Sequence, residues 1–135
     1  MIGLDTNVLV RYVVQDDPDQ ARAATHLIEN RCSPEEPAFI CSLVLAELAW
    51  VLRGPYRYAR PLVAGVLRQI LRTVEFAVEE PAVAWAALKD YETGAADFAD
   101  YWIGHNNHAR GCRRTYTFDV KAARGVHFTP VDEAG

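Results

Sequence analysis

Short runs of β-forming residues alternate with helical patterns along the whole chain, and this alternation is what most constrains the fold. The order is typical of α/β domains, in which helices connect parallel strands. We expect a three-layer α/β/α sandwich with a mainly parallel sheet of four to five strands. Strands are predicted at Met1–Leu4, Ala38–Cys41, Thr73–Val78, Thr115–Phe118 and Val126–Thr129. Helices are predicted at Val8–Val14, 16–30, Leu43–Leu52, Arg60–Arg72, Pro81–Tyr91 and Asp97–Ala109, with Ser42 as the N-cap of the third.

The chain of 135 residues contains no linker or repeat, so we expect a single domain over residues 1–135. Its net charge is −4, which argues against binding nucleic acid by overall positive charge and leaves a local patch as the alternative. The three cysteines form no C-x-x-C pair and suggest no disulfide framework. These features favour a reducing, cytoplasmic setting.

Membrane insertion and export are not expected from the sequence. The longest nearly apolar run, Leu43–Leu52, is too short to cross a bilayer and carries Glu47 in its middle. The start of the chain lacks a basic region followed by an apolar stretch and a cleavage site.

Acidic side chains fall at the places where strands end or neighbouring helices begin. Asp5 follows the first predicted strand and Asp119 follows the fourth, while Glu47 lies early in the helix after the second. Asp97 and Asp100 open the helix that precedes the fourth strand. Ligand sites in parallel sheets lie beyond the carboxyl ends of the strands. We therefore expect these acids to converge at one edge of the sheet.

Glu47 is the most informative of these acids. The helix Leu43–Leu52 is apolar on every other face, and a helix of that kind is predicted to be buried. A buried carboxylate needs a cation or a polar cleft. The alternative is that Glu47 points to solvent through a gap in the packing. The other four acids have an ordinary explanation as well, because Asp5, Asp97, Asp100 and Asp119 stand where helices and turns are commonly capped.

A cluster of carboxylates requires a counter-charge. At about 5 Å and an effective dielectric constant of about 20, each pair repels by roughly 3 kcal/mol before screening. Oxygen ligands suit Mg²⁺, with Mn²⁺ as a substitute, and such an ion activates water and stabilises charge on a phosphate. Among the histidines, His105 and His108 share a helix face, where a transition-metal site is a weaker alternative, whereas His26 and His127 read as ordinary surface or strand-edge residues.

A local basic stretch lies between residues 53 and 72, where five arginines occur without an acid and with Tyr56 and Tyr58 among them. Arginine contacts phosphate through two donors and stacks on exposed bases, so the stretch predicts contact with single-stranded or looped RNA. The alternative is a solvated helix face whose arginine stems cover apolar surface. The candidate RNA-binding residues are Arg53, Arg60, Arg68 and Arg72.

Four segments in order resemble the motifs of the PIN-domain nucleases, and their order and the chain length resemble the VapC-type toxins of bacterial toxin–antitoxin pairs. They are Leu4–Val10, Ser42–Leu48, Ala96–Ile103 and Thr115–Asp119. The third motif usually continues with small and aliphatic residues where this chain has Tyr101 and Trp102. In the family, the residue matching Asp100 is the usual third acid and that matching Asp97 an additional one.

The resemblance implies a Mg²⁺-dependent endoribonuclease, commonly a homodimer, that a cognate antitoxin protein holds inactive. On this reading Asp5, Glu47, Asp100 and Asp119 hold the metal, Asp97 assists, and metal-activated water cleaves RNA phosphodiesters. Two other functions remain open. One is a catalytically silent PIN-like module that binds RNA or protein. The other is an aspartyl-phosphate phosphotransferase with Asp5 as nucleophile, a chemistry that in its best-known family has a second Asp where this chain has Asn7.

Overall fold

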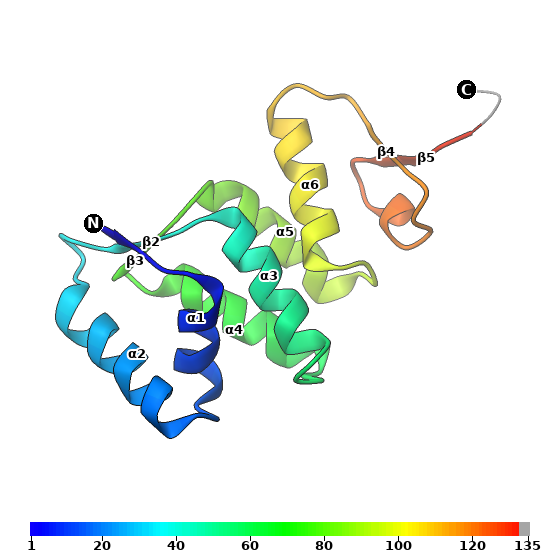
Figure 1. Ribbon diagram of the computed structural model, residues 1–135. Coiled ribbons are helices and arrows are strands. Elements are labelled where there is room, and N and C mark those ends of the chain that lie inside the picture. Colours follow the sequence, from blue (N-terminus) through cyan, green and yellow to red (C-terminus); the bar gives the residue numbers. More distant parts are fainter. Residues whose placement is uncertain (133–135) are drawn as a thin grey trace. The chain divides into compact units, whose positions relative to one another are not determined.

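The computed structural model describes residues 1–132, and these residues divide into two compact units, 1–81 and 82–132. Figure 1 labels the helices and strands along the chain. Each unit is described by itself. The prediction that residues 1–135 form one domain stays a prediction, and residues 133–135 lie outside the described part.

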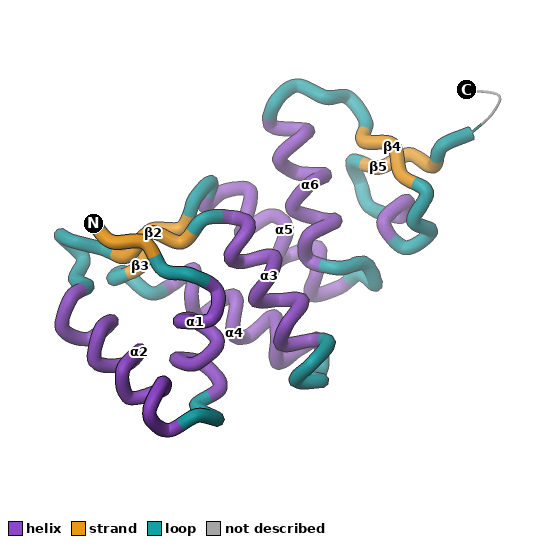
Figure 2. The backbone as a smooth tube through the Cα atoms, in the orientation of Figure 1, coloured by secondary structure: helices purple, strands orange, loops and turns teal. Residues whose placement is uncertain are grey.

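The first unit contains a parallel three-stranded sheet in the order β1-β2-β3. Ile2 of β1 is in register with Ala38 of β2, which is in register with Phe76 of β3. The elements are β1 (Ile2–Gly3), α1 (Thr6–Val14), α2 (Pro18–Arg31), β2 (Ala38–Ile40), α3 (Ser42–Arg53), α4 (Arg60–Arg72) and β3 (Phe76–Val78). Figure 2 shows the short strands and the helices that connect them. The strands are shorter than predicted, while α4 begins and ends at the predicted residues.

The interior of the first unit consists of aliphatic side chains from the sheet and its helices. Leu9, Ile40, Leu45 and Leu67 are completely buried. Helix α1 contacts α2 and α3, and α3 contacts α4. Burial of these side chains fixes the direction in which α1 and α3 leave the carboxyl ends of β1 and β2. Asp5 caps α1 at this end, and Glu47 lies in the second turn of α3.

The cap predicted for α3 is wrong. Ser42 is the first residue of the helix rather than its N-cap, and Cys41 takes the N-cap position without a side-chain hydrogen bond. The Ser42 amide instead donates to Oε1 of Glu79 at 2.8 Å. Glu79 follows β3, so a carboxylate from a neighbouring strand satisfies the helix terminus that Ser42 was expected to cap.

The second unit contains α5 (Pro81–Thr93) apart from its first residue, α6 (Phe98–Ala109), β4 (Thr115–Thr117), the 3₁₀ turn η1 (Ala122–Arg124) and β5 (Phe128–Pro130). Tyr91 and Phe98 meet edge to face with ring centroids 6.3 Å apart. Strands β4 and β5 pair in parallel. The parallel pairing predicted from the sequence is confirmed, but among the described residues the strands form a sheet of three and a separate pair rather than one continuous sheet.

Candidate active site

Asp5 and Glu47 both belong to the first unit, Asp5 at the start of α1 and Glu47 in the second turn of α3. Asp5 is the N-cap of α1, and its Oδ1 accepts a 2.8 Å hydrogen bond from the Thr6 amide. The Thr6 hydroxyl donates to Oε1 of Glu47 at 2.7 Å. Thr6 therefore links the two acids, a role that the sequence analysis missed, although its place directly after Asp5 is visible in the sequence.

The environment predicted for Glu47 is wrong. Its side chain is exposed, and helix α3 is not buried on all faces. Leu43 and Trp50 are 69% and 67% exposed and share the open stripe of the helix with Glu47. Helix α3 therefore has one buried apolar face and one exposed face that also carries apolar side chains. Because the Glu47 carboxylate is exposed, it needs no buried cation to stabilise it.

Asp97 and Asp100 begin helix α6 in the second unit. Asp97 is the N-cap, and its amide donates to Oδ2 of Asp100 at 3.3 Å, as in a capping box. The helix-capping role that the sequence suggested as the alternative for Asp97 and Asp100 is thus observed in the structure. Capping holds the Asp100 carboxylate beside the first turn of the helix.

Asp119 follows β4 and caps the next turn. Its Oδ1 accepts a 2.8 Å hydrogen bond from the Ala122 amide, and its own amide donates to the Thr117 hydroxyl at 3.0 Å. These two bonds fix the Asp119 segment relative to β4. They also provide the turn-capping role that the sequence offered as the alternative.

Asp97, Asp100 and Asp119 line one pocket of about 290 Å³ in the second unit. Lys121 lines the same pocket and is a residue that the sequence analysis did not single out. Burial raises the pKa of the Asp100 carboxyl, and the neighbouring carboxylates of Asp97 and Asp119 raise it further, whereas the Asp97 amide opposes them. Burial is the larger cause of the raised pKa, and the repulsion from the two neighbouring carboxylates adds to it.

The donors at both sites are carboxylate oxygens, which fit a hard divalent cation such as Mg²⁺ in kind. Within residues 1–132, however, no three His, Cys, Asp or Glu side chains are placed so as to hold a metal ion. The structure brings together Asp97, Asp100 and Asp119 around one pocket in the second unit and links Asp5 to Glu47 through Thr6 in the first. The predicted metal set of Asp5, Glu47, Asp100 and Asp119 stays a prediction.

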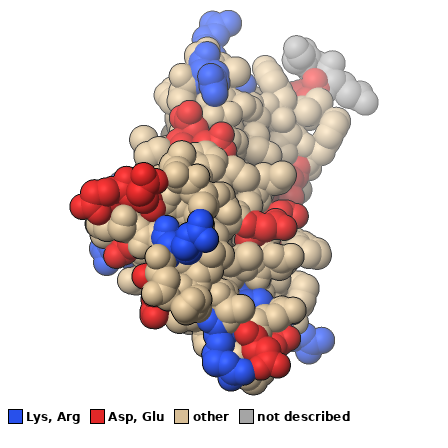
Figure 3. All heavy atoms as spheres, turned by 60° about the vertical axis from the view of Figure 1, so that its left-hand side comes forward, with Lys and Arg blue, Asp and Glu red and all other residues tan. Residues whose placement is uncertain are grey.

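The candidate RNA-binding arginines differ in their surroundings. Arg53 donates to the Tyr58 carbonyl at 3.2 Å, across its own turn. Arg60 and Arg68 are half-buried on α4, and Arg72 is exposed. Positive and negative side chains are mixed over the face in Figure 3, which carries no continuous basic patch. The role of the four arginines in RNA binding stays a prediction.

Tyr56, one of the two interleaved tyrosines, is occupied in a polar network. Its hydroxyl donates to Oδ2 of Asp16 at 2.8 Å and accepts from Arg11 at 3.1 Å. The hydroxyl of Tyr56 lowers the pKa of the Asp16 carboxyl, and Arg11 lowers it further. Asp16 in turn raises the pKa of Tyr56. This network braces the start of α2 against α1 and the turn after α3.

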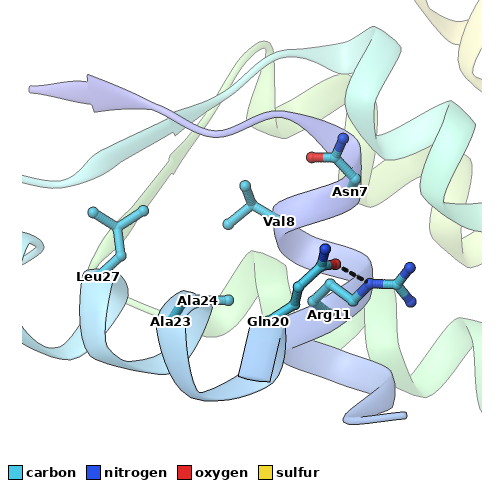
Figure 4. A pocket seen from close by; sticks show the side chains of 7 residues that line it. All are labelled: Asn7, Val8, Arg11, Gln20, Ala23, Ala24 and Leu27. Atoms are coloured by element: carbon cyan, nitrogen blue, oxygen red, sulfur yellow. Dashed lines mark hydrogen bonds between the residues drawn. The ribbon is translucent and has the colours of Figure 1, made fainter. Parts of the chain in front are cut away.

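Beside that network, a groove of about 490 Å³ runs between α1 and α2. Figure 4 shows Val8, Ala23, Ala24 and Leu27 along it and the hydrogen bond from Arg11 to Gln20 at one end. Asn7 adds a second polar group. An apolar groove with polar groups at one end is the kind of surface that receives one face of an amphipathic helix.

The family model of the PIN domain matches residues 2–125. The chain therefore belongs to the PIN domain family, and the predicted three-layer α/β fold is confirmed by this match. It is also similar to Ribonuclease VapC24 of Mycobacterium tuberculosis, from strain CDC 1551 / Oshkosh and from strain ATCC 25618 / H37Rv. In each case the identity is 34% over 73 residues, which is 54% of this chain and 49% of the relative.

The match thus spans about half the length of these curated relatives. No solved structure matches the chain. No helix within residues 1–132 is long and apolar enough to cross a membrane.

Proposed function

We propose that this protein is a metal-dependent endoribonuclease that acts as the toxin of a toxin–antitoxin pair. The observation that carries the proposal is the pocket in which a PIN-domain chain gathers Asp97, Asp100 and Asp119. The similarity to Ribonuclease VapC24 supports RNA as the substrate. Burial and the neighbouring carboxylates raise the pKa of Asp100, so the folded chain disfavours the charge on Asp100, and a bound cation would favour it.

In this proposal the reaction is hydrolysis of an RNA phosphodiester by water, with no side chain as nucleophile. Asp5, Glu47, Asp100 and Asp119 would hold Mg²⁺, or Mn²⁺ in its place, and Asp97 assists. The bound ion supplies a Lewis acid for the phosphate and makes water a stronger nucleophile. Thr6 orients Glu47 through its hydroxyl and meets the Asp5 carboxylate through its amide. The capping hydrogen bonds hold the side chains of Asp100 and Asp119 in fixed directions.

The test compares wild type with Asp5→Asn in cells and on RNA. Asparagine is as good an N-cap as aspartate, so the variant retains α1 and loses the charge. Asp19→Asn is the control, because Asp19 is an exposed helix acid paired only locally with Arg22. We expect wild type and Asp19→Asn to slow growth and cleave RNA when Mg²⁺ is present, and Asp5→Asn to do neither. Equal growth inhibition by wild type and Asp5→Asn at matched soluble levels would contradict the proposed mechanism.

A second candidate function is a catalytically silent PIN-like module that binds RNA or protein. The observation that favours it is that Asp5, Asp97, Asp100 and Asp119 all have capping roles. Retained RNA binding without cleavage in Mg²⁺ or Mn²⁺, by wild type and Asp5→Asn alike, would support this module. Metal-dependent cleavage by wild type would exclude it.

We propose that a cognate antitoxin binds this protein and that the groove between α1 and α2 is its docking surface. The groove's apolar floor and its Arg11–Gln20 end support this assignment. Ala23 is exposed within the groove, so Ala23→Arg fills it without entering the core. Ala109→Arg, at an exposed alanine of α6, is the matched control. We expect growth rescue by the co-expressed product of the adjacent gene to fail for Ala23→Arg alone.

We further propose a cytoplasmic homodimer. The three cysteines are free thiols, as in a reducing compartment, and the exposed Leu43 and Trp50 on α3 provide apolar surface for a second copy. Light scattering of wild type and Trp50→Glu tests the assembly. A dimeric mass for wild type and a monomeric mass for the variant are expected.

A further inference from the structure

Three histidines and one aspartate gather in the second unit, away from the carboxylates of the pocket. His105 and His108 lie on α6, His127 directly precedes β5, and Asp90 lies on α5. The His108 and His127 rings stack with centroids 3.9 Å apart and an angle of 14°. His105 meets His127 edge to face at 4.8 Å, and its Nε2 lies 2.6 Å from Oδ2 of Asp90. We call these four residues the histidine cluster.

The histidine cluster lies where the β4–β5 pair rests on α6. A Cβ at Gly104 of α6 would lie only 2.6 Å from Cε2 of Phe128, so the helix and β5 approach closely. The Asn107 side chain donates to the Thr115 hydroxyl at 3.0 Å, and the Thr115 amide donates to the His127 carbonyl at 2.8 Å. The packing of His127 against α6 is therefore part of the same interface that holds β4.

That interface joins the two elements next to which two of the candidate site acids lie. Asp100 stands at the start of α6, and Asp119 follows β4. We propose that His127 is a positioning residue: its neutral ring, packed between His105 and His108, holds the Asp119 segment against the helix that carries Asp100, and its protonation loosens this hold. The consequence for RNA cleavage rests on the proposed function, whereas the docking itself does not.

The charged and titratable groups around His127 favour its neutral form. Burial lowers the pKa of His127, and His108, His105 and Arg114 lower it further, whereas Asp90 raises it. Arg114 reaches this region by donating to the Val126 carbonyl at 3.0 Å and to the Thr129 hydroxyl. A proton on His127 would stand face to face with His108 and near a guanidinium.

The sign of the pH effect follows from the lowered pKa. Above the ordinary histidine pKa both the folded and the unfolded chain carry neutral His127, and the packing of its ring is at full strength. As the pH falls below that value, the unfolded chain takes up the proton first, so the free energy of unfolding decreases until the folded pKa is reached. Protonation of His127 should therefore lower the free energy of unfolding in mildly acidic solution.

A transition-metal site is the competing role for the same side chains. The stacked rings of His108 and His127 argue against it, because ring nitrogens direct their lone pairs within the ring planes and nearly parallel planes do not meet at one ion. The experiment below therefore also measures thermal unfolding with added Zn²⁺ or Ni²⁺, which would reveal a metal site.

The experiment follows thermal unfolding of the full chain from about pH 8 to about pH 5 in chelator, for wild type and His127→Phe. Phenylalanine keeps a flat ring and cannot be protonated. We expect wild type to lose several degrees more in melting temperature on acidification than the variant. His108→Gln, which removes the stacked imidazole and keeps His127, should show an intermediate loss. Hydrogen exchange across residues 115–130 should increase with acid in wild type and not in His127→Phe.

Equal pH dependence of melting and exchange in wild type and His127→Phe would overturn the proposal. So would a rise in melting temperature with Zn²⁺ or Ni²⁺ that His127→Phe abolishes, because the cluster would then be a metal site. If RNA is cleaved, wild type should lose activity in acid more steeply than His127→Phe. If no variant cleaves RNA, the proposed function fails, while the melting and exchange data still decide the role of His127.

Discussion

Thr6 and Glu47 are joined by a 2.7 Å hydrogen bond from the threonine hydroxyl to the glutamate Oε1, across 41 residues of sequence. The amide of the same threonine donates to Asp5. One residue thus orients the two candidate acids of the first unit, the first through its backbone and the second through its side chain. Because this hydrogen bond is exposed, it contributes little to the free energy of unfolding, and its main effect is to orient the Glu47 side chain.

Thr6→Val should separate these two contributions. Valine has the shape of threonine without the hydroxyl, so Glu47 loses its donor while the Asp5 cap remains. We expect RNA cleavage to fall at least several-fold and the free energy of unfolding to fall by less than about 1 kcal/mol. Thr6→Ser keeps the hydroxyl and is the control. Cleavage by Thr6→Val at the wild-type rate would show that Glu47 needs no orientation by this bond.

The basic side chains of α4 can be tested through the salt dependence of RNA binding. We expect Arg68→Ala combined with Arg72→Ala to weaken binding and to flatten the slope of log affinity against log salt by about 0.7 for each phosphate that the variant no longer neutralises. Arg31→Ala, at an exposed arginine of α2, is the matched control. An unchanged slope would show that Arg68 and Arg72 only cover apolar surface with their stems. The next candidates would then be a second basic run in the sequence between α6 and β4, formed by Arg110, Arg113 and Arg114.

Local signals in the sequence were sufficient for most helix boundaries. Asp17 and Pro18 start α2, Gly54 ends α3, and Asp97 caps α6, in each case through backbone chemistry within a few residues. The acids predicted at the carboxyl ends of strands are found there, because parallel strands impose that order on the chain. These features depend on neighbours in sequence and could be predicted.

Features that depend on distant partners could not be predicted. The cap of α3 comes from Glu79, and nothing near Ser42 signals it. Glu47 is exposed because one face of α3 is left open to solvent. Hydrophobic periodicity cannot show which face is open when the other positions from Leu43 to Leu52 are all apolar. From the sequence, His127 was expected to be an ordinary surface or strand-edge residue, but in the structure its ring packs against His105 and His108 of α6.

The Glu79 cap itself leads to a measurable expectation. Glu79→Ala leaves the Ser42 amide without its acceptor, and the free energy of unfolding should fall by about 1 kcal/mol. Glu79→Gln retains an acceptor oxygen and should lose less. Glu80→Ala, at the exposed neighbouring position, serves as the control for removing a charge. Chemical denaturation of the three variants measures these differences. Equal stability of Glu79→Ala and Glu80→Ala would show that the Glu79 cap contributes little to the free energy of unfolding.

Asp100→Asn distinguishes a carboxylate kept for function from one kept for folding. Burial and the charges of Asp97 and Asp119 raise the pKa of Asp100, so at neutral pH the folded chain carries a charge that it disfavours. Asparagine removes the charge and still accepts the Asp97 amide bond. After a discount for partial exposure, we expect a gain of about 0.5–1 kcal/mol in chelator, which is a rise of a few degrees in melting temperature.

The pH dependence of that gain has a definite sign. Because the folded pKa of Asp100 is raised, the penalty on wild type is present above that pKa and disappears as the pH falls through it, so the two melting temperatures should converge in acid. Millimolar Mg²⁺ should then raise the melting temperature of wild type more than that of Asp100→Asn, since a bound ion stabilises the folded chain in proportion to its occupancy. If Asp100 serves only as a helix cap, the variant should instead melt lower in chelator, because it loses the favourable interaction of a charge with the helix N-terminus. A lower melting temperature for Asp100→Asn, together with no effect of Mg²⁺ on wild type, would exclude Asp100 as a metal ligand.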